Sequence, residues 1–117
     1  MVKRGLPARD DDLEQLTNLL RLLSDKTRLN ILLMLSGGER NVSSLCDALR
    51  LPQPTVSHHL GLLRMSNIIT GRRDGKQVFY GLDGRVNTEK DCLEIGAGAY
   101  SVCIGSSSVA VPAGAAS

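Results

Sequence analysis

The sequence contains very few aromatic residues, with no Trp, one Phe and two Tyr among 117 residues. This scarcity excludes a core built on stacked rings, so the hydrophobic residues (42% of the chain) must pack through aliphatic side chains. Leucines dominate the first half of the chain, which is typical of a small, mainly helical core. The length predicts a single domain.

Long apolar runs and paired cysteines are also absent. No run reaches about 18 apolar residues, so we expect no membrane-spanning helix. The segment from Met1 to Gly5 lacks the apolar stretch of a signal peptide, so we expect a cytoplasmic location. The three cysteines are an odd number, which argues against a secreted disulfide framework and predicts thiols that are reduced at rest.

The net charge is small, at +2, but it is unevenly distributed. Between Pro54 and Arg85 there are five basic and two acidic residues, so this segment carries +3 and the rest of the chain −1. A basic module on a nearly neutral body is typical of proteins that bind nucleic acid.

Helical patterns fill the first half of the chain. After a flexible leader (residues 1–9), leucines at helical spacing predict an amphipathic helix from Asp10 to about Leu23. Its apolar side covers more than half of its circumference. The helix could be a core element only, but so short a chain has little else to cover this surface, which favours a homodimer through it.

A helix-turn-helix follows. Ser24-Asp25 is predicted as the N-cap of a helix from Lys26 to about Ser36, and Asn41 to Ser43 as the cap of a short helix over 44–50. The two prolines around Gln53 predict that the next helix covers residues 54–66.

Two strands come next, within 68–82, on either side of Asp74-Gly75, a dipeptide typical of tight hairpins. The fold class is therefore mainly α with a β-wing, a winged helix-turn-helix domain over residues 10–83. Residues 84–117 are predicted to be a β-like C-terminal extension, with a hairpin at 92–104 and a flexible end.

The helix over 54–66 is expected to bind DNA. On a helical wheel Leu60 and Leu63 lie within about 40° of Val56, and the three form its buried stripe with His59 about 60° to one side. The residues expected to contact bases or phosphates are Gln53, Thr55, Ser57, His58 and Arg64, and a solvated surface is the alternative for each. A Gln53 amide can bind adenine through two hydrogen bonds.

The hairpin tip gathers the cations Arg72, Arg73 and Lys76, which predicts phosphate or minor-groove contacts rather than a merely solubilising loop. Ser57, His58 and His59 are residue types found in hydrolase sites, but adjacent residues on a helix point in different directions and cannot act together as a site. We therefore expect no enzymatic activity, and we expect His59 to be a packed or capping residue.

Three segments together resemble the ArsR/SmtB family: LSDKTRLNIL at 23–32, QPTVSHHLGLLR at 53–64, and RRDGK at 72–76 followed by YGL at 80–82. The resemblance covers roughly residues 10–83. It implies a homodimeric transcriptional repressor whose binding to double-stranded operator DNA changes when an effector binds or a thiol is oxidised. A winged helix used for protein interaction is the competing function.

The chain departs from the family at its sensor positions. Metal-sensing relatives carry a Cys-x-Cys pair where this chain has Asn41 and Ser43. Zinc-sensing relatives use Asp, Glu and His on a C-terminal helix, whereas both histidines of this chain, His58 and His59, fall in the predicted DNA-binding helix. No bound cofactor is therefore expected, apart from a soft metal or metalloid on cysteines.

The cysteines are the candidate sensor. Cys46 is expected in the first turn of its helix, where the helix dipole favours a thiolate, or else as a small core residue. If residues 96–99 form the loop of the C-terminal hairpin, Cys92 lies directly opposite Cys103. The hypothesis is a thiol switch, or a soft-metal site, that uses Cys103 with Cys92 or Cys46. A regulator without a thiol sensor is the alternative.

Overall fold

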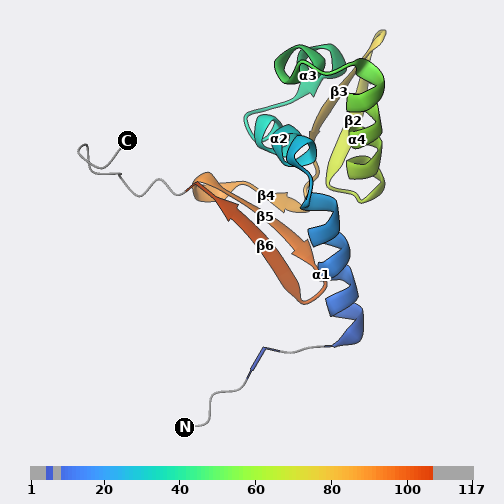
Figure 1. Cartoon of the computed structure of the whole chain (residues 1–117). Helices are drawn as coiled ribbons and strands as arrows, with labels where there is room; N and C mark the ends of the chain where they lie inside the picture. The colour runs from blue at the N-terminus through green and yellow to red at the C-terminus, as the bar shows by residue number, and fades with distance from the viewer. Residues whose placement is uncertain (1–4, 7–8, 107–117) are drawn as a thin grey trace, which may run out of the picture.

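The structure is a computed structural model that describes residues 5–6 and 9–106. Figure 1 shows helix α1 between a unit made of α2, α3, α4 and the β-wing and a second, C-terminal β-sheet. The helices are α1 (Asp10–Leu23), α2 (Lys26–Leu35), α3 (Val42–Leu49), α4 (Gln53–Met65) and the 3-10 helix η1 (Glu89–Asp91). The strands are β1 (Arg40–Asn41), β2 (Ile69–Asp74), β3 (Gln77–Leu82), β4 (Val86–Asn87), β5 (Cys92–Ala97) and β6 (Tyr100–Gly105).

The predicted winged helix-turn-helix and β-like extension are both confirmed. Most of the predicted leader, and the predicted flexible end after residue 106, lie outside the described residues. Within the described chain no helix combines the length and the hydropathy needed to cross a membrane.

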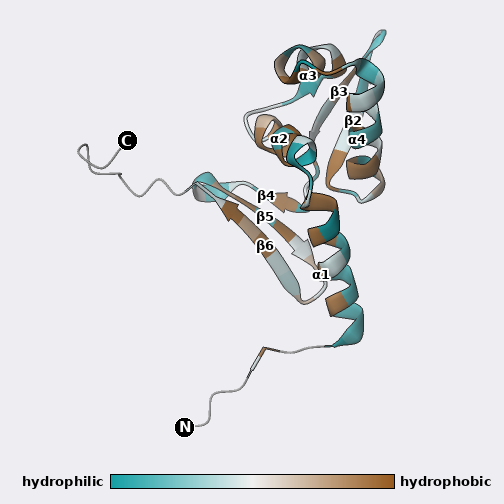
Figure 2. Cartoon of the chain, viewed as in Figure 1, coloured by the Kyte–Doolittle hydropathy of each residue, from teal (hydrophilic) through white to brown (hydrophobic). Residues whose placement is uncertain are grey.

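The core is aliphatic, as the composition predicts. The largest fully buried side chains come from α2, α3, α4, β5 and the segment that enters β2: Ile31, Leu32, Leu45, Val56, Leu60, Leu63, Ile68, Ile69 and Ile95. In Figure 2 the first turn of α1 and the tip of the wing are hydrophilic, so the ends of the molecule carry its polar residues.

Side-chain caps start two of the helices. Asp25 Oδ1 accepts a hydrogen bond from the backbone N–H of Arg28 at 2.9 Å, and Asn41 Oδ1 accepts one from Ser44 N–H at 2.8 Å. Helix α3 begins at Val42, two residues earlier than predicted. Cys46 therefore lies in the second turn, and its placement in the first turn was wrong.

The turn between α3 and α4 is short. Arg50 ends α3 in the left-handed conformation, with φ 56°, and its backbone N–H donates to the carbonyl of Cys46. Pro52 is extended and acts as the N-cap of α4, so this helix starts at Gln53, one residue before the predicted start.

The wing hairpin is confirmed, with its turn one residue later than predicted. Asp74 pairs with Gln77, so the central turn residues are Gly75 and Lys76. Gly75 has φ +64°, and a glycine with positive φ at the first central position is typical of a type II′ turn. A third strand, β1, pairs with β3, and its two residues are too few to show a sequence pattern.

The C-terminal sheet has the strand order β4-β5-β6 and packs on α1. The predicted loop at 96–99 was wrong, because Ala97 pairs with Tyr100 and only Gly98 and Ala99 form the turn. Gly98 supplies φ +63°, which permits this tighter turn, and Ala97 extends the buried side of β5 by one more residue.

This register differs from the predicted one by two residues, so Cys103 lies opposite Glu94 and not opposite Cys92. Because side chains alternate with a period of two, a two-residue shift leaves both cysteines on the same, outer face. They are diagonal neighbours with Cα atoms 6.5 Å apart, and they are joined by a disulfide. Of the two partners left open for Cys103, the structure joins it to Cys92, while Cys46 is free. The placement of Cys92 directly opposite Cys103 was wrong, and so was the expectation that all three thiols are reduced.

Arg85 connects the C-terminal sheet to the end of α4. Its Nε and Nη2 donate to the carbonyl of Gly96 at 3.0 and 2.7 Å, and its Nη1 donates to the carbonyl of Ser66 at 2.7 Å. One guanidinium thus holds β5 and the residue that ends α4 together.

The β5–β6 turn gives a stability test. Gly98→Ala should destabilise the fold by about 1–2 kcal/mol, because an alanine resists the left-handed conformation. Its Cβ would also lie 2.5 Å from Asp12 Oδ1, the acceptor of a hydrogen bond from Ala99 N–H. Urea unfolding measures the loss. Gly96→Ala is the matched control, since an added Cβ there meets nothing within 4 Å. Equal stability of the two variants would contradict the described turn.

Candidate nucleic-acid interface

Helix α4 is divided along its length into a buried stripe and an exposed polar side. Val56, Leu60 and Leu63 are each at most 1% exposed, as predicted from the helical wheel. His59 and Leu62 beside the stripe are half-buried. The predicted contact residues of this helix lie on its other faces and are all exposed: Gln53, Thr55, Ser57, His58 and Arg64. The structure thus leaves every one of them accessible to a partner.

The exposed side is also flat near its middle. A Cβ added to Gly61 would meet nothing within 4 Å, and Ser57 one turn earlier is small. The side chain of Gln53 is exposed at the N-terminal end of the helix. Such a surface can approach base edges or phosphates closely.

Arg72 is held at the wing rather than left free. Its Nη2 lies 2.8 Å from Glu39 Oε1, and its guanidinium lies 5.2 Å from the centre of the Phe79 ring. The hydrogen bond from Arg72 lowers the pKa of the Glu39 carboxyl, and the same pair raises the pKa of Arg72. Sequence reasoning missed Glu39, which lies 33 residues from its partner.

Arg73 and Lys76 remain exposed at the wing tip. Among the described residues, neither forms an ion pair within 4.0 Å. The wing therefore presents two unneutralised cations beside the exposed side of α4, and a third, Arg72, whose charge is shared with Glu39.

A cavity of about 390 Å³ lies between α3, the start of α4 and the wing. Cys46 and Gln53 line it together with Lys76 of the wing turn. At its edge Asn41 Nδ2 donates to Gln77 Oε1 at 2.9 Å, which ties the start of α3 to β3. Cys46 is half-buried here as a free thiol, far in the sequence from the other two cysteines.

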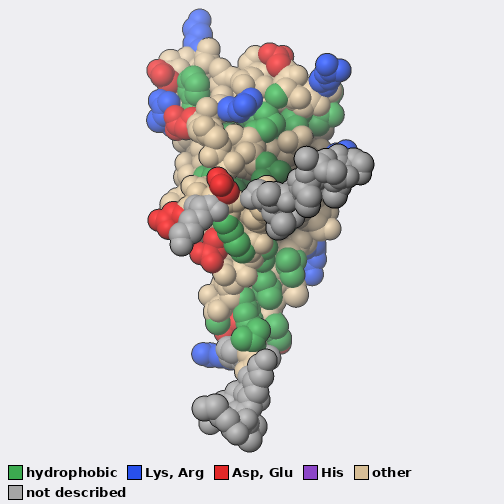
Figure 3. Space-filling model, turned by 90° about the vertical axis from the view of Figure 1, so that its left-hand side faces the viewer, with side chains coloured by type: hydrophobic (Ala, Val, Ile, Leu, Met, Phe, Trp, Pro, Cys, Tyr) green, Lys and Arg blue, Asp and Glu red, His purple; other side chains and the backbone are tan. Residues whose placement is uncertain are grey.

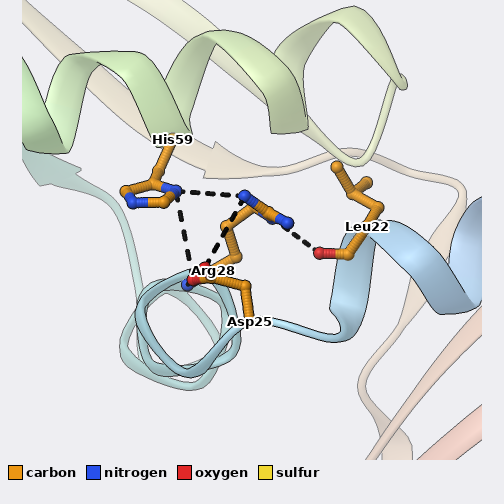
Figure 4. A network of polar contacts seen from close by, with 4 residues as sticks. All are labelled: Leu22, Asp25, Arg28 and His59. Carbon is orange, nitrogen blue, oxygen red and sulfur yellow. Dashed lines mark hydrogen bonds and ion pairs between the residues drawn. The ribbon is translucent and has the colours of Figure 1, made fainter.

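On the side of α4 that faces the protein interior, a polar network links the helix to α1 and α2 (Figure 4). Arg28 Nε donates to the carbonyl of Leu22 at 2.6 Å, while Arg28 Nη1 lies 3.2 Å from His59 Nδ1 and 3.9 Å from Asp25 Oδ2. The His59 side chain is only 14% exposed, so its prediction as a packed residue is confirmed. Sequence reasoning assigned no partner to Arg28, because a lone arginine produces no periodic signal.

In the described part of the chain, one group of residues has ligand atoms close enough to hold a metal ion. It consists of the exposed carboxylates Asp10 and Asp11 in the first turn of α1 and Glu14 in the next turn. Acidic residues there also interact favourably with the helix dipole, which explains their position without an ion.

Comparisons with known proteins agree on one family. The family described as "Bacterial regulatory protein, arsR family" matches residues 25–70. The chain is 45% identical over 64 residues to the HTH-type transcriptional repressor SmtB of Mycobacterium tuberculosis, covering 55% of this chain and 47% of that one. It is 31% identical to the transcriptional repressor SdpR of Bacillus subtilis, covering 61% and 79%. The chain thus spans about half of SmtB but most of SdpR.

A solved structure shares the fold. It is the homodimeric winged helix-turn-helix DNA-binding domain of a possible ArsR-family regulator from Mycobacterium bovis. The sequence identity is 29% and the TM-score 0.59, with 66% of this chain and 74% of that one covered.

The Asp25 cap predicts a pH dependence of stability. The hydrogen bond from Arg28 N–H, together with the charges of Arg28 and His59, lowers the pKa of Asp25 below 3.8. A depressed folded-state pKa gives stability that is complete above the unfolded pKa and is lost as the pH falls through the folded one. Asp25→Asn keeps a capping oxygen but no charge. Between about pH 5 and pH 3 it should therefore lose less stability than the wild type in urea unfolding.

Asp47→Asn, which removes an exposed carboxyl of α3, is the control and should lose as much as the wild type. An Asp25→Asn variant with the full wild-type acid sensitivity would show that this carboxylate does not stabilise the fold.

Proposed function

This chain belongs to the ArsR family of bacterial regulatory proteins, and on that premise we propose that it is a homodimeric transcriptional repressor that binds double-stranded operator DNA. The observation that carries this proposal is that α4 has a buried apolar stripe and an exposed polar side. Burial of Val56, Leu60 and Leu63 turns the small polar residues of the helix outward. A helix of this kind fits the major groove, where bases are distinguishable by their edges.

Base contacts are assigned to the first two turns of α4. Gln53 can donate and accept at once, which matches the N6 and N7 positions of adenine. Thr55, Ser57 and His58 can hydrogen-bond to neighbouring bases or phosphates, and Arg64 to the backbone near the end of the helix. Residues near the start of a recognition helix make most base contacts, and Gln53, Thr55, Ser57 and His58 lie there.

The wing is assigned to the phosphate backbone. Arg73 and Lys76 are the exposed cations at its tip, and each can neutralise one phosphate. Arg72 is 54% exposed, so it can add a contact while its ion pair with Glu39 orients the β2 strand.

The dimer interface is assigned to the exposed side of α1. Leu13 and Leu20 are 39% and 47% exposed, and Leu16 between them is half-buried. These leucines follow one another on one flank of the helix, which a second copy can cover. A symmetric dimer would present two recognition helices to half-sites about one helical turn of DNA apart.

The sensor is assigned to Cys92 and Cys103. Two thiols here can react with a peroxide to form one disulfide, with two water molecules released when the oxidant is hydrogen peroxide. Arg85 supplies a connection from this hairpin to α4, because it binds the carbonyls of both Gly96 and Ser66. A thiophilic metal or metalloid ion bound by the two thiolates is the second chemistry that this pair can support.

A pair of variants tests the DNA assignment. Arg73→Ala should flatten the dependence of log affinity on log salt by about one unit, the loss of one phosphate contact. Gln53→Ala should keep the salt slope and lower the preference for adenine at one position. Fluorescence anisotropy on DNA from upstream of the protein's own gene measures both. Arg21→Ala, an exposed arginine on α1, is the control. An unchanged slope in Arg73→Ala would remove the wing from the interface.

Mild oxidation tests the sensor assignment. Peroxide added to the reduced protein should remove two hydrogens per chain by intact mass, and peptide mapping should find Cys92 joined to Cys103. The affinity for operator DNA should then change by about fivefold or more, the usual size of a coupling between sites. The change should disappear in Cys92→Ser and persist in Cys46→Ser.

Three free thiols and an unchanged affinity after peroxide would refute the thiol switch. If the affinity responds instead to a thiophilic ion in the reduced protein, and Cys92→Ser removes that response, the pair is a metal site.

A further inference from the structure

The last strand of the C-terminal sheet has an open edge. Within the described residues β6 pairs only with β5, and Figure 1 shows it on the side of the sheet away from β4. Its sequence, Tyr-Ser-Val-Cys-Ile-Gly, contains no charged residue and no proline. Edge strands that stay unpaired usually carry such residues to prevent association.

The hairpin turn determines which backbone groups are free. Ala97 and Tyr100 close a two-residue turn, so they form a hydrogen-bonded pair, and such pairs alternate along an antiparallel ladder. Val102 and Ile104 therefore direct their N–H and C=O groups toward β5. The corresponding groups of Ser101, Cys103 and Gly105 point outward from the edge.

Apolar surface accompanies this edge. The side chains of Val102 and Ile104 lie on the inner face of the sheet and remain half-buried, since the helices cover β5 more fully than β6. Leu33 of α2, which is 52% exposed, lines a cavity of about 520 Å³ together with Ile104. Helix α1, with its own exposed leucines, packs against β6. Figure 3, which views the side of this sheet, shows hydrophobic side chains in a band down the lower half of the molecule.

We propose that a second copy of this chain docks on this edge, and that β6 pairs antiparallel with the partner's β6 in a register centred on Cys103. The proposal rests on the proposed homodimer and names its surface. A two-fold axis brings identical strands together antiparallel, so the edge is complementary to itself. Helix α1, which carries the exposed leucines, is in contact with β6, so the two proposed dimer surfaces belong to neighbouring elements.

The outward backbone N–H and C=O groups of β6 determine the register of the two paired strands. When Cys103 lies opposite the partner's Cys103, Ser101 lies opposite the partner's Gly105, and all the outward groups of the strand find partners within it. In a register shifted by one residue toward either end, one of these residues falls opposite a position outside β6. The central register also places Val102 beside the partner's Ile104 on the inner face, which buries both half-exposed side chains.

Ser101→Pro tests the pairing. Proline removes the outward N–H of residue 101 but none of the hydrogen bonds to β5, so the hairpin should persist. Loss of this bond on both sides of the two-fold axis should weaken dimerisation by about tenfold or more in sedimentation velocity. Ser101→Ala is the matched control, because it keeps the N–H and loses the same hydroxyl contact to Glu94. Thermal melting checks that both variants fold.

Cross-linking tests the register independently. With Cys46→Ser and Cys92→Ser, the remaining Cys103 should form a covalent dimer under copper–phenanthroline and air. Ser101→Cys in a cysteine-free chain is the control, since two residues 101 would lie about 13 Å apart along the strands and should cross-link poorly.

The outcomes separate the surface from the homodimer. A wild type that is monomeric while it binds operator DNA would overturn both. A wild-type dimer that survives Ser101→Pro and gives no Cys103 cross-link would overturn only the surface. If the full-length chain is monomeric and a chain without residues 107–117 dimerises, the occupant of the β6 edge is that segment and not a second copy.

Discussion

The burial of three side chains of α4 constrains the rest of the structure. Val56, Leu60 and Leu63 lie on one stripe and are almost completely removed from solvent against α2, α3 and the wing. Each such contact contributes roughly 2–5 kcal/mol when compared with an alanine, so the helix cannot rotate about its axis. Because the stripe is fixed inward, the residues from Gln53 to Arg64 on the other faces are fixed outward.

Polar contacts then fix α4 at separate points along its length. His59 meets Arg28 near the middle of the helix, and Arg85 binds the carbonyl of Ser66 at its end. Beside its start, the hydrogen bond between Asn41 and Gln77 joins α3 to the wing. The same Arg85 guanidinium also binds the carbonyl of Gly96 in β5, so it links the disulfide hairpin to the end of α4.

Much of this could be predicted from the sequence, because the deciding interactions are local or periodic. Helical spacing of leucines, the caps at Asp25 and Asn41, and the Asp74-Gly75 dipeptide indicate the order of the elements correctly. The buried stripe of α4 follows from the same periodicity. Cys92 and Cys103 were predicted to share one face of the hairpin, and they do even though the register was wrong, since an even shift leaves every side chain on its face.

What could not be predicted depends on contacts between distant residues. The pairs Arg28–His59 and Glu39–Arg72 join residues more than thirty positions apart, and no local pattern connects them. The strands β1 and β4 have two residues each, too few for alternation to be visible. The turn at Gly98 is two residues tighter than expected because it depends on the backbone angle that glycine adopts there.

The central claim is that the outward side of α4 recognises a DNA sequence. The most direct test is a competition between DNA from upstream of the protein's own gene and a shuffled fragment of the same length and composition, at one fixed salt concentration. If α4 recognises a DNA sequence, one dimer should bind the upstream fragment at least about a thousandfold more tightly than the shuffled one. Equal affinity for the two fragments would contradict the claim.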